Sequence, residues 1–119
     1  MKKTLVLGAS TNPQRYSYRA TRMLTDRGYE AVPVGIKKGA IAGIDIINGT
    51  PESDDIDTVT LYLNPERQKQ YYDYILGLKP NRIIFNPGTE NFELVRLAKE
   101  QGIETAIACT LVMLSTGQY

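Results

Sequence analysis

The chain has 119 residues, of which 42% are hydrophobic and 23% charged, with a formal net charge of +1, one cysteine and no histidine. This length and composition predict a single globular domain, and no apolar run is long enough for a signal peptide or a membrane span, so we expect a cytoplasmic protein without a membrane partner. Without histidine, the chain cannot itself form a Ser-His-Asp triad, a Cys-His pair, a phosphohistidine or a histidine-based metal site, and we expect no metal.

Strand-like and helix-like segments alternate along the chain. Short apolar runs predict strands at residues 3–7, 31–34, 58–62, 82–85 and 105–108, with a further short strand near 44–47 inside a Gly-rich excursion. Spacing and end signals predict helices at about 17–26, 65–77, 91–101 and 110–115. This alternation predicts one domain over residues 1–119: a doubly wound parallel α/β sheet in three layers, α/β/α, with strand order near 3-2-1-4-5-6.

The helices carry local signals of their own. Tyr16, Ala20, Met23 and Leu24 recur at helical spacing in the first helix, which Gly28 ends. Asn64 and Pro65 supply an N-cap and a proline at the first helical position, so the second helix begins there.

The turn after the first strand is the first candidate binding element. A strand leads into Gly8, Ala9, Ser10, Thr11 and Asn12 and then into a helix, which is how a nucleotide-binding α/β domain begins. Backbone N–H groups, hydroxyls and the positive end of a helix suit a phosphate, and a glycine allows close approach. Only the first glycine of G-x-G-x-x-G is present, so an ordinary βα turn is the alternative.

Positive charge is concentrated at the start of the chain. Residues 1–38 hold eight Lys and Arg against two acids, a net charge of +6, whereas the remainder holds six against eleven, a net charge of −5. This asymmetry favours an anionic ligand near the first two strands, although solvated surface charge explains it as well. Arg15 is close enough to the Gly8 turn to bind a phosphate, while we expect Arg19 and Arg22 to face solvent.

Two lysines, Lys37 and Lys38, follow the second strand, where a dinucleotide-binding domain usually has an acid that binds the ribose hydroxyls. Cations at this position favour a ribose that carries an additional phosphate, which means NADP or coenzyme A. A basic surface turn is the alternative interpretation.

Loops that follow later strands predict further binding groups at the same edge of the sheet. Tyr62, Leu63 and Asn64 follow one strand, and Asn86, Pro87 and Gly88 follow the next. A tyrosine can pack on a base or an acyl chain, and the Asn86 amide and Gly88 backbone can donate to a pyrophosphate or an amide. Helix and turn geometry alone would also account for Pro65 and Gly88.

Cys109 is predicted at this edge too, at the start of the last helix. A helix N-terminus lowers the pKa of a thiol, so one hypothesis is a thiol that faces a ligand thiol and forms a mixed disulfide. The other is a buried, inert cysteine.

Taken together, these segments resemble the small CoA-binding domain proteins, which are Rossmann-like domains similar to the CoA-binding part of the succinyl-CoA synthetase α subunit. The resemblance covers almost the whole chain. It depends on the order and spacing of residues 8–13 with Arg15, Ser17 and Tyr18, and of residues 28–34, 56–60, 86–88, 98–103 and 108–112. Two departures stand out: many relatives have Asn-Pro where this chain has Gly35 and Ile36, and the aromatic-rich exit of the fifth strand is here residues 85–88.

The resemblance implies that coenzyme A lies across the carboxyl edge of the sheet. Gly8 to Asn12 and Arg15 would then lie near phosphates, and Ser17 and Tyr18, which follow them in the shared motif, would also belong to the binding site. The segment Val34, Gly35, Ile36, Lys37 and Lys38 would face the adenosine 3′-phosphate, and residues 62–64 and 86–88 would line the pantetheine side. The ligase activity of the synthetase does not transfer, because its phosphohistidine is impossible here.

We therefore expect a protein that binds CoA or an acyl-CoA as a carrier, a sensor or a thiol-protecting partner, and not a free-standing enzyme. An NADP-binding reductase domain is the first alternative, although no tyrosine and lysine stand at Tyr-x-x-x-Lys spacing. A regulatory or oligomerisation module with a vestigial pocket is the second. A homodimer or another protein partner is compatible with the sequence, whereas near-neutral charge and the lack of an aromatic-basic motif argue against nucleic acid.

Overall fold

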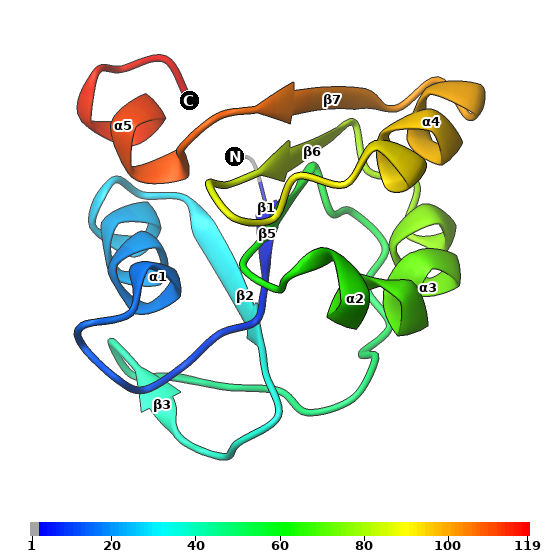
Figure 1. The fold of residues 1–119 in the computed structure, drawn as a ribbon. Helices are drawn as coiled ribbons and strands as arrows, with labels where there is room; N and C mark the ends of the chain where they lie inside the picture. Colours follow the sequence, from blue (N-terminus) through cyan, green and yellow to red (C-terminus); the bar gives the residue numbers. More distant parts are fainter. Residues whose placement is uncertain (1–2) are drawn as a thin grey trace.

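The computed structural model describes residues 3–119. Its centre is a five-stranded, all-parallel sheet in the order β2-β1-β5-β6-β7. Figure 1 labels the strands of this sheet within the whole fold. The strands are β1 (Lys3–Leu7), β2 (Glu30–Val34), β5 (Thr58–Leu61), β6 (Arg82–Phe85) and β7 (Glu104–Ile107). The chain builds outward from β1 in one direction to β2 and then in the other direction to β5, so a topological switch point lies beside β1.

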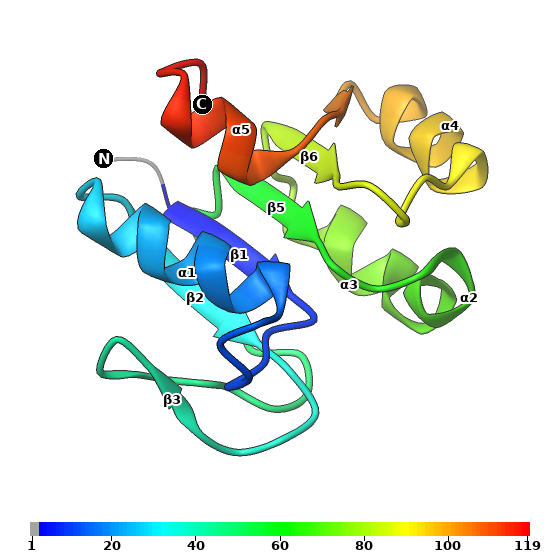
Figure 2. The ribbon, with the colours of Figure 1, turned by 60° about the vertical axis from the view of Figure 1, so that its left-hand side comes forward.

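Helices cover both faces of this sheet (Figures 1 and 2). One face is covered by α1 (Tyr16–Asp26) and α5 (Thr110–Ser115), which pack beside each other. The other face is covered by α2 (Pro65–Gln68), the 3₁₀ turn η1 (Lys69–Tyr71), α3 (Tyr72–Gly77) and α4 (Phe92–Glu100). The predicted three-layer α/β/α architecture is therefore confirmed.

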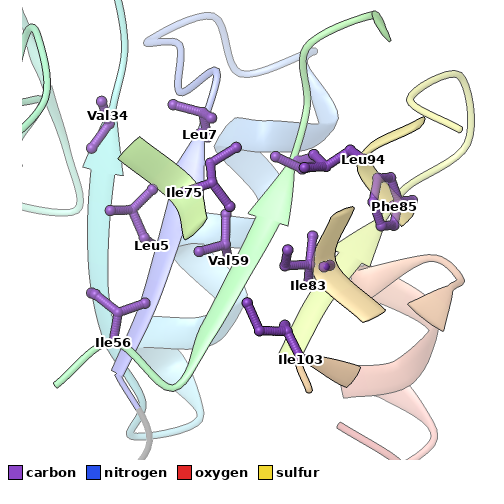
Figure 3. Packing of buried hydrophobic residues seen from close by; sticks show 12 residues of the cluster. Leu5, Leu7, Val34, Ile56, Val59, Ile75, Ile83, Phe85, Leu94 and Ile103 are labelled. Atoms are coloured by element: carbon purple, nitrogen blue, oxygen red, sulfur yellow. The ribbon is translucent and has the colours of Figure 1, made fainter. Parts of the chain in front are cut away.

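The two faces of the sheet carry different side chains. Leu5, Val59, Ile83 and their neighbours form the main apolar core under α3 and α4, shown in Figure 3. The other face includes threonines that are fully buried, and one of them, Thr60 of β5, is hydrogen bonded at 2.8 Å to Thr110, a fully buried residue of α5. Because strands buried on both faces must satisfy such polar groups internally, these contacts fix α5 against the sheet.

The predicted strand near residues 44–47 does not join the main sheet. Instead, β3 (Ala40–Ile41) and β4 (Ile44–Asp45) pair with each other in an antiparallel hairpin, and Ile47 alone makes a single parallel bridge to Val34. The two turn residues, Ala42 and Gly43, both have positive φ angles, 51° and 80°. Such a turn matches a tight two-residue hairpin, so the segment folds back on itself rather than extending the sheet.

Two helix predictions also need correction. Tyr16 is 62% exposed, and the buried face of α1 is made instead by Ser17, Ala20, Thr21 and Leu24. The expected continuous helix over 65–77 is divided into α2 and α3 by the 3₁₀ turn. Gln68, at the end of α2, is completely buried and bonds to the carbonyls of Leu63 and Thr89 at 2.8 Å, which holds α2 against the loops after β5 and β6.

Within residues 3–119, none of the helices has the length and apolar character of a membrane span.

Candidate functional site

A cleft with a volume of about 920 Å³ lies at the carboxyl ends of β1, β2, β5 and β6. This volume falls within the usual range for small-molecule sites. The location is the one at which open α/β sheets bind ligands, beside the switch point at β1. Among the predicted site residues, fifteen line the cleft: Gly8, Ala9, Ser10, Thr11, Arg15, Ser17, Val34, Gly35, Ile36, Lys37, Tyr62, Leu63, Asn64, Pro87 and Gly88.

Five of the predicted site residues lie outside this lining: Asn12, Tyr18, Lys38, Asn86 and Cys109. Each has a different environment. Asn12 caps its own turn, because its side-chain oxygen accepts the Gln14 N–H at 3.0 Å. Tyr18 packs at the edge of the cluster beneath α1. Lys38 is exposed one residue beyond the cleft wall.

The glycines of the cleft serve loop packing. Gly8, with φ +100°, passes so close to the Tyr62 backbone that an added Cβ would lie 3.0 Å from its carbonyl carbon and oxygen. An added Cβ at Gly35 would collide with the carbonyl oxygen of Ala9. The Gly8 and Ala9 N–H groups both donate to the Val34 carbonyl at 2.9 Å. These two N–H groups, which the sequence predicts to face a phosphate, are therefore already hydrogen bonded to the backbone and cannot bind it.

The donors that remain for an anion lie further along the same loop. The backbone N–H groups of Ser10 and Thr11, and those of Tyr16 and Ser17 in the first turn of α1, donate to no group within residues 3–119. Arg15 is the N-cap residue of α1 and gives no side-chain cap. Free N–H groups at a helix start, next to two hydroxyls, form a site suited to phosphate.

All the charged side chains that line the cleft are positive. Its lining includes three cations, Arg15, Lys37 and Arg67, and no aspartate or glutamate. The cations that form ion pairs within residues 3–119 are Lys3, Lys69 and Arg96. None of the three cleft cations is therefore paired with a carboxylate in this part of the chain. A concave surface with this charge attracts a polyanion.

The loop that carries Lys37 is held in place by the segment after β4. Asn48 donates its side-chain amide to the Gly35 carbonyl at 2.6 Å and to the Lys37 carbonyl at 3.4 Å. The Gly35 N–H in turn donates to the Ile47 carbonyl at 3.1 Å. The hairpin excursion therefore supports the cation at the end of β2.

Asn86 has a structural role that the sequence did not indicate. Its amide nitrogen donates to the Thr60 hydroxyl at 2.6 Å and to the Leu61 carbonyl at 2.8 Å, and its side-chain oxygen accepts the Thr110 N–H at 2.9 Å. Both amide hydrogens are used and the residue is only 2% exposed. The expectation that Asn86 donates to a ligand is therefore wrong; it connects β5, β6 and α5.

Tyr62 lines the cleft, and its hydroxyl is buried. Burial raises the pKa of Tyr62 to about 12, and the neighbouring hydroxyls of Thr110 and Thr60 counteract that rise only in part. Those two threonines are bonded to each other and to Asn86, and the Tyr62 hydroxyl has no hydrogen-bond partner within residues 3–119. An unpartnered buried hydroxyl destabilises the fold slightly.

Cys109 is half-buried at the start of α5 and does not line the cleft. This placement favours the inert cysteine over one that faces a ligand thiol. Among residues 3–119, no group of three or more cysteine and acidic side chains could hold a metal ion.

Several residues of the cleft wall are not among those predicted from the sequence, chiefly Arg67, Gln70 and Tyr71. They follow β5 at helical spacing of three and four residues, so they share one side of the α2–η1 segment. The N-cap signal at Asn64 fixes where this segment begins, but it does not indicate which side of the segment faces the cleft. Leu7, Gln14, Tyr16 and Thr89 complete the set that was missed.

Comparisons with known proteins identify relatives of this chain. A family model described as a CoA binding domain matches residues 2–115. The uncharacterized protein YneT of Bacillus subtilis is 26% identical over 102 residues, which cover 85% of this chain and 76% of YneT.

Solved structures share the whole fold. The crystal structure of an uncharacterized protein has 55% sequence identity and a TM-score of 0.97, covering 100% of this chain and 98% of that one. A Thermus thermophilus structure has 22% identity and a TM-score of 0.86, covering 99% and 90% of the two chains, and therefore shows the fold alone. The family match spans nearly the full length, and the chain belongs to the CoA-binding domain family.

Proposed function

We propose that this protein binds coenzyme A or an acyl-CoA in the cleft at the carboxyl edge of its sheet. The observation that carries the proposal is the cation set of the cleft, Arg15, Lys37 and Arg67, within a lining that has no carboxylate. Coenzyme A has a 3′-phosphate in addition to a pyrophosphate, so it brings more negative charge to these three cations than NAD does. Membership of the CoA-binding domain family supports the same ligand.

The order of the strands suggests how the ligand lies. Lys37 follows β2, at one end of the cleft, and is the proposed partner of the 3′-phosphate. Arg15, with the free N–H groups of Ser10 and Thr11, is the proposed partner of the pyrophosphate, since it follows the neighbouring β1. Pantetheine would then extend past Tyr62 and Leu63 toward Pro87, over β5 and β6.

Two exposed apolar side chains of the cleft suit the adenine ring. Ile36 is 77% exposed and Tyr16 is 62% exposed, and both lie on the cleft lining close to the proposed phosphate partners. Bases stack on such side chains, with a contribution of about 1–3 kcal/mol for an aromatic ring. Binding would cover this apolar surface, which the free protein leaves in water.

We further propose that the protein is a CoA carrier, sensor or thiol-protecting partner and not a free-standing enzyme. The cleft lining offers hydroxyls, amides and cations, but it contains no carboxylate, histidine or cysteine that could serve as a general base or nucleophile. Such a set of groups can bind and orient a polyanion.

Differential scanning fluorimetry with CoA, dephospho-CoA, acetyl-CoA, NADP and NAD tests the proposal. A ligand that binds only the native state at a hundredfold excess over its Kd stabilises it by about 2.7 kcal/mol. We expect a clear rise in Tm with CoA and acetyl-CoA, a smaller one with dephospho-CoA and none with NAD. A rise with NADP and none with CoA would contradict the proposal and favour the reductase alternative. No rise with any of these ligands would favour a vestigial pocket.

A further inference from the structure

Arg67 is a cation of the cleft that the proposed nucleotide contacts leave unused. Its backbone N–H donates to the side-chain oxygen of Asn64 at 2.9 Å, so its position in the first turn of α2 is fixed. The neighbouring acid, Glu66, pairs with Lys69 at 3.3 Å. Within residues 3–119, the Arg67 guanidinium therefore has no carboxylate partner while it lines the cleft.

The segment that carries Arg67 is firmly attached to the rest of the cleft. The next residue, Gln68, is completely buried and donates its amide to the carbonyls of Leu63 and Thr89, both at 2.8 Å. The Gln68 side-chain oxygen accepts a hydrogen bond from Asn91 at 2.9 Å. Since every hydrogen-bonding group of the Gln68 side chain is used, α2 is held at a constant place relative to the loops after β5 and β6.

Arg67 is separated from the other two cations by the order of the strands. Lys37 follows β2, Arg15 follows β1 and Arg67 follows β5, so the three lie in sequence along the edge of the sheet. If Lys37 and Arg15 bind the phosphates, Arg67 lies toward the thiol end of the ligand. The wall beside it adds Gln70 and Tyr71, with Thr89 from the loop after β6.

This end of the cleft is suited to a small anionic group and unsuited to a long hydrocarbon chain. A fatty-acyl chain requires a deep apolar channel, because each methylene gains about 0.8 kcal/mol only when it leaves water. Here the wall has Leu63 and Pro87 as apolar members, but beside them it presents the exposed side chains of Arg67 and Gln70, a guanidinium and an amide. A guanidinium binds a carboxylate through two parallel hydrogen bonds, which gives both charge and shape selectivity.

We propose that the preferred ligand is the CoA thioester of a short dicarboxylic acid, and that Arg67 binds its free carboxylate. This inference rests on the proposed CoA-binding function and adds the class of acyl group to it. Arg67 therefore discriminates between acyl groups, whereas Lys37 and Arg15 serve the nucleotide that all CoA thioesters share.

Isothermal titration calorimetry at a fixed salt concentration tests this assignment, with succinyl-CoA, malonyl-CoA and acetyl-CoA as probes. The variants are Arg67→Gln and, as a matched control, Arg96→Gln, whose arginine pairs with Glu100 on α4 and does not line the cleft. We expect the wild type to bind at least one dicarboxylic thioester about tenfold more tightly than acetyl-CoA. Arg67→Gln should remove that preference by weakening the dicarboxylic thioester about tenfold more than it weakens acetyl-CoA or free CoA, and Arg96→Gln should leave all affinities unchanged.

The outcomes separate this inference from the proposed function. If wild-type protein binds no CoA compound, both fail. If it binds CoA and all three thioesters equally, the proposed function stands and the acyl-group assignment is wrong. If Arg67→Gln weakens free CoA and every thioester by the same factor, Arg67 binds a phosphate and the assignment is again wrong. The Tm of each variant without ligand verifies that folding is intact.

Discussion

The side-chain oxygen of Asn86 accepts a hydrogen bond from the backbone N–H of Thr110 at 2.9 Å. This contact joins the end of β6 to the first residue of α5, 24 positions later in the chain. The same side chain bonds to β5 through Thr60 and Leu61. One buried amide therefore sets the positions of the loop that presents Pro87 and Gly88 to the cleft.

Asn86→Ala should lower the free energy of unfolding by about 3 kcal/mol, because it leaves buried backbone groups of Leu61 and Thr110 without partners. Chemical denaturation measures this change. The control is Asn12→Ala, at an exposed turn where the side chain makes a single local bond, and it should cost less than about 1 kcal/mol. Equal costs for the two variants would contradict the bridging role of Asn86.

Lys37 and Lys38 are adjacent, yet only Lys37 lines the cleft. We predict that Lys37→Gln weakens CoA binding about tenfold, because it removes the proposed charged contact to the 3′-phosphate. Lys38→Gln changes only a surface charge, so its effect should stay within about twofold. Calorimetry with CoA and dephospho-CoA measures both: Lys37→Gln should bind the two ligands almost equally. If Lys37→Gln still prefers CoA as the wild type does, another residue binds the 3′-phosphate.

The main sheet could be predicted from the sequence because each strand is a short apolar run whose neighbours are set by the order of the chain. Residues 3–7 and 82–85 coincide with β1 and β6 for this reason. The hairpin at residues 40–45 could not be predicted in the same way. The tight turn of this hairpin depends on positive φ angles at Ala42 and Gly43, and an alanine in the sequence gives no indication that it adopts a positive φ angle.

The candidate site was predictable where it followed strand ends, and less so where it depended on tertiary contacts. Gly8 and Lys37 occupy the cleft because the carboxyl ends of parallel strands meet at one edge. The Gly8 N–H instead donates to the Val34 carbonyl at the end of β2, and this bond depends on the pairing of β1 with β2, which no local pattern encodes. Arg67 was missed for a related reason: its exposure to the cleft depends on the burial of Gln68 beside it.

Tyr62 and Tyr74 should respond in opposite ways to loss of the hydroxyl. The Tyr62 hydroxyl is buried without a partner, whereas that of Tyr74 donates to the Pro51 carbonyl at 2.5 Å. Tyr62→Phe should therefore raise the free energy of unfolding by about 0.5–1 kcal/mol, and Tyr74→Phe should lower it by about 1 kcal/mol. Urea denaturation at pH 7 measures both values, and a destabilised Tyr62→Phe protein would mean that the hydroxyl has a partner.

The same tyrosine makes stability depend on alkaline pH. Burial raises the pKa of Tyr62 from 10.0 to about 12, so the unfolded chain loses this proton first as the pH rises. The contribution of this proton to the free energy of unfolding is complete below pH 10. Between pH 10 and 12 the free energy of unfolding falls by about 1.4 kcal/mol per pH unit until that contribution is lost. Tyr62→Phe should remove this part of the slope. Tyr119, whose pKa burial also raises, remains in both proteins, so the difference between their profiles isolates Tyr62.

Gly35→Ala is predicted to damage both the fold and the cleft. A Cβ at residue 35 would collide with the Ala9 carbonyl oxygen, and that loop cannot withdraw without stretching the bonds from the Gly8 and Ala9 N–H groups to Val34. Overpacking of this kind costs about 1–3 kcal/mol. Because the two loops form adjacent walls of the cleft, their separation should also weaken CoA binding about tenfold or more.

Gly28→Ala is the matched control for that substitution. Gly28 has φ +85° and open space around it, so alanine there meets only backbone strain of about 1 kcal/mol, far from the cleft lining. Thermal unfolding and CoA titration of both variants separate the two effects. We expect Gly28→Ala to lose some stability and keep its affinity for CoA, and Gly35→Ala to lose both. If Gly35→Ala binds CoA as tightly as Gly28→Ala, the close approach of the loops after β1 and β2 does not shape the binding site.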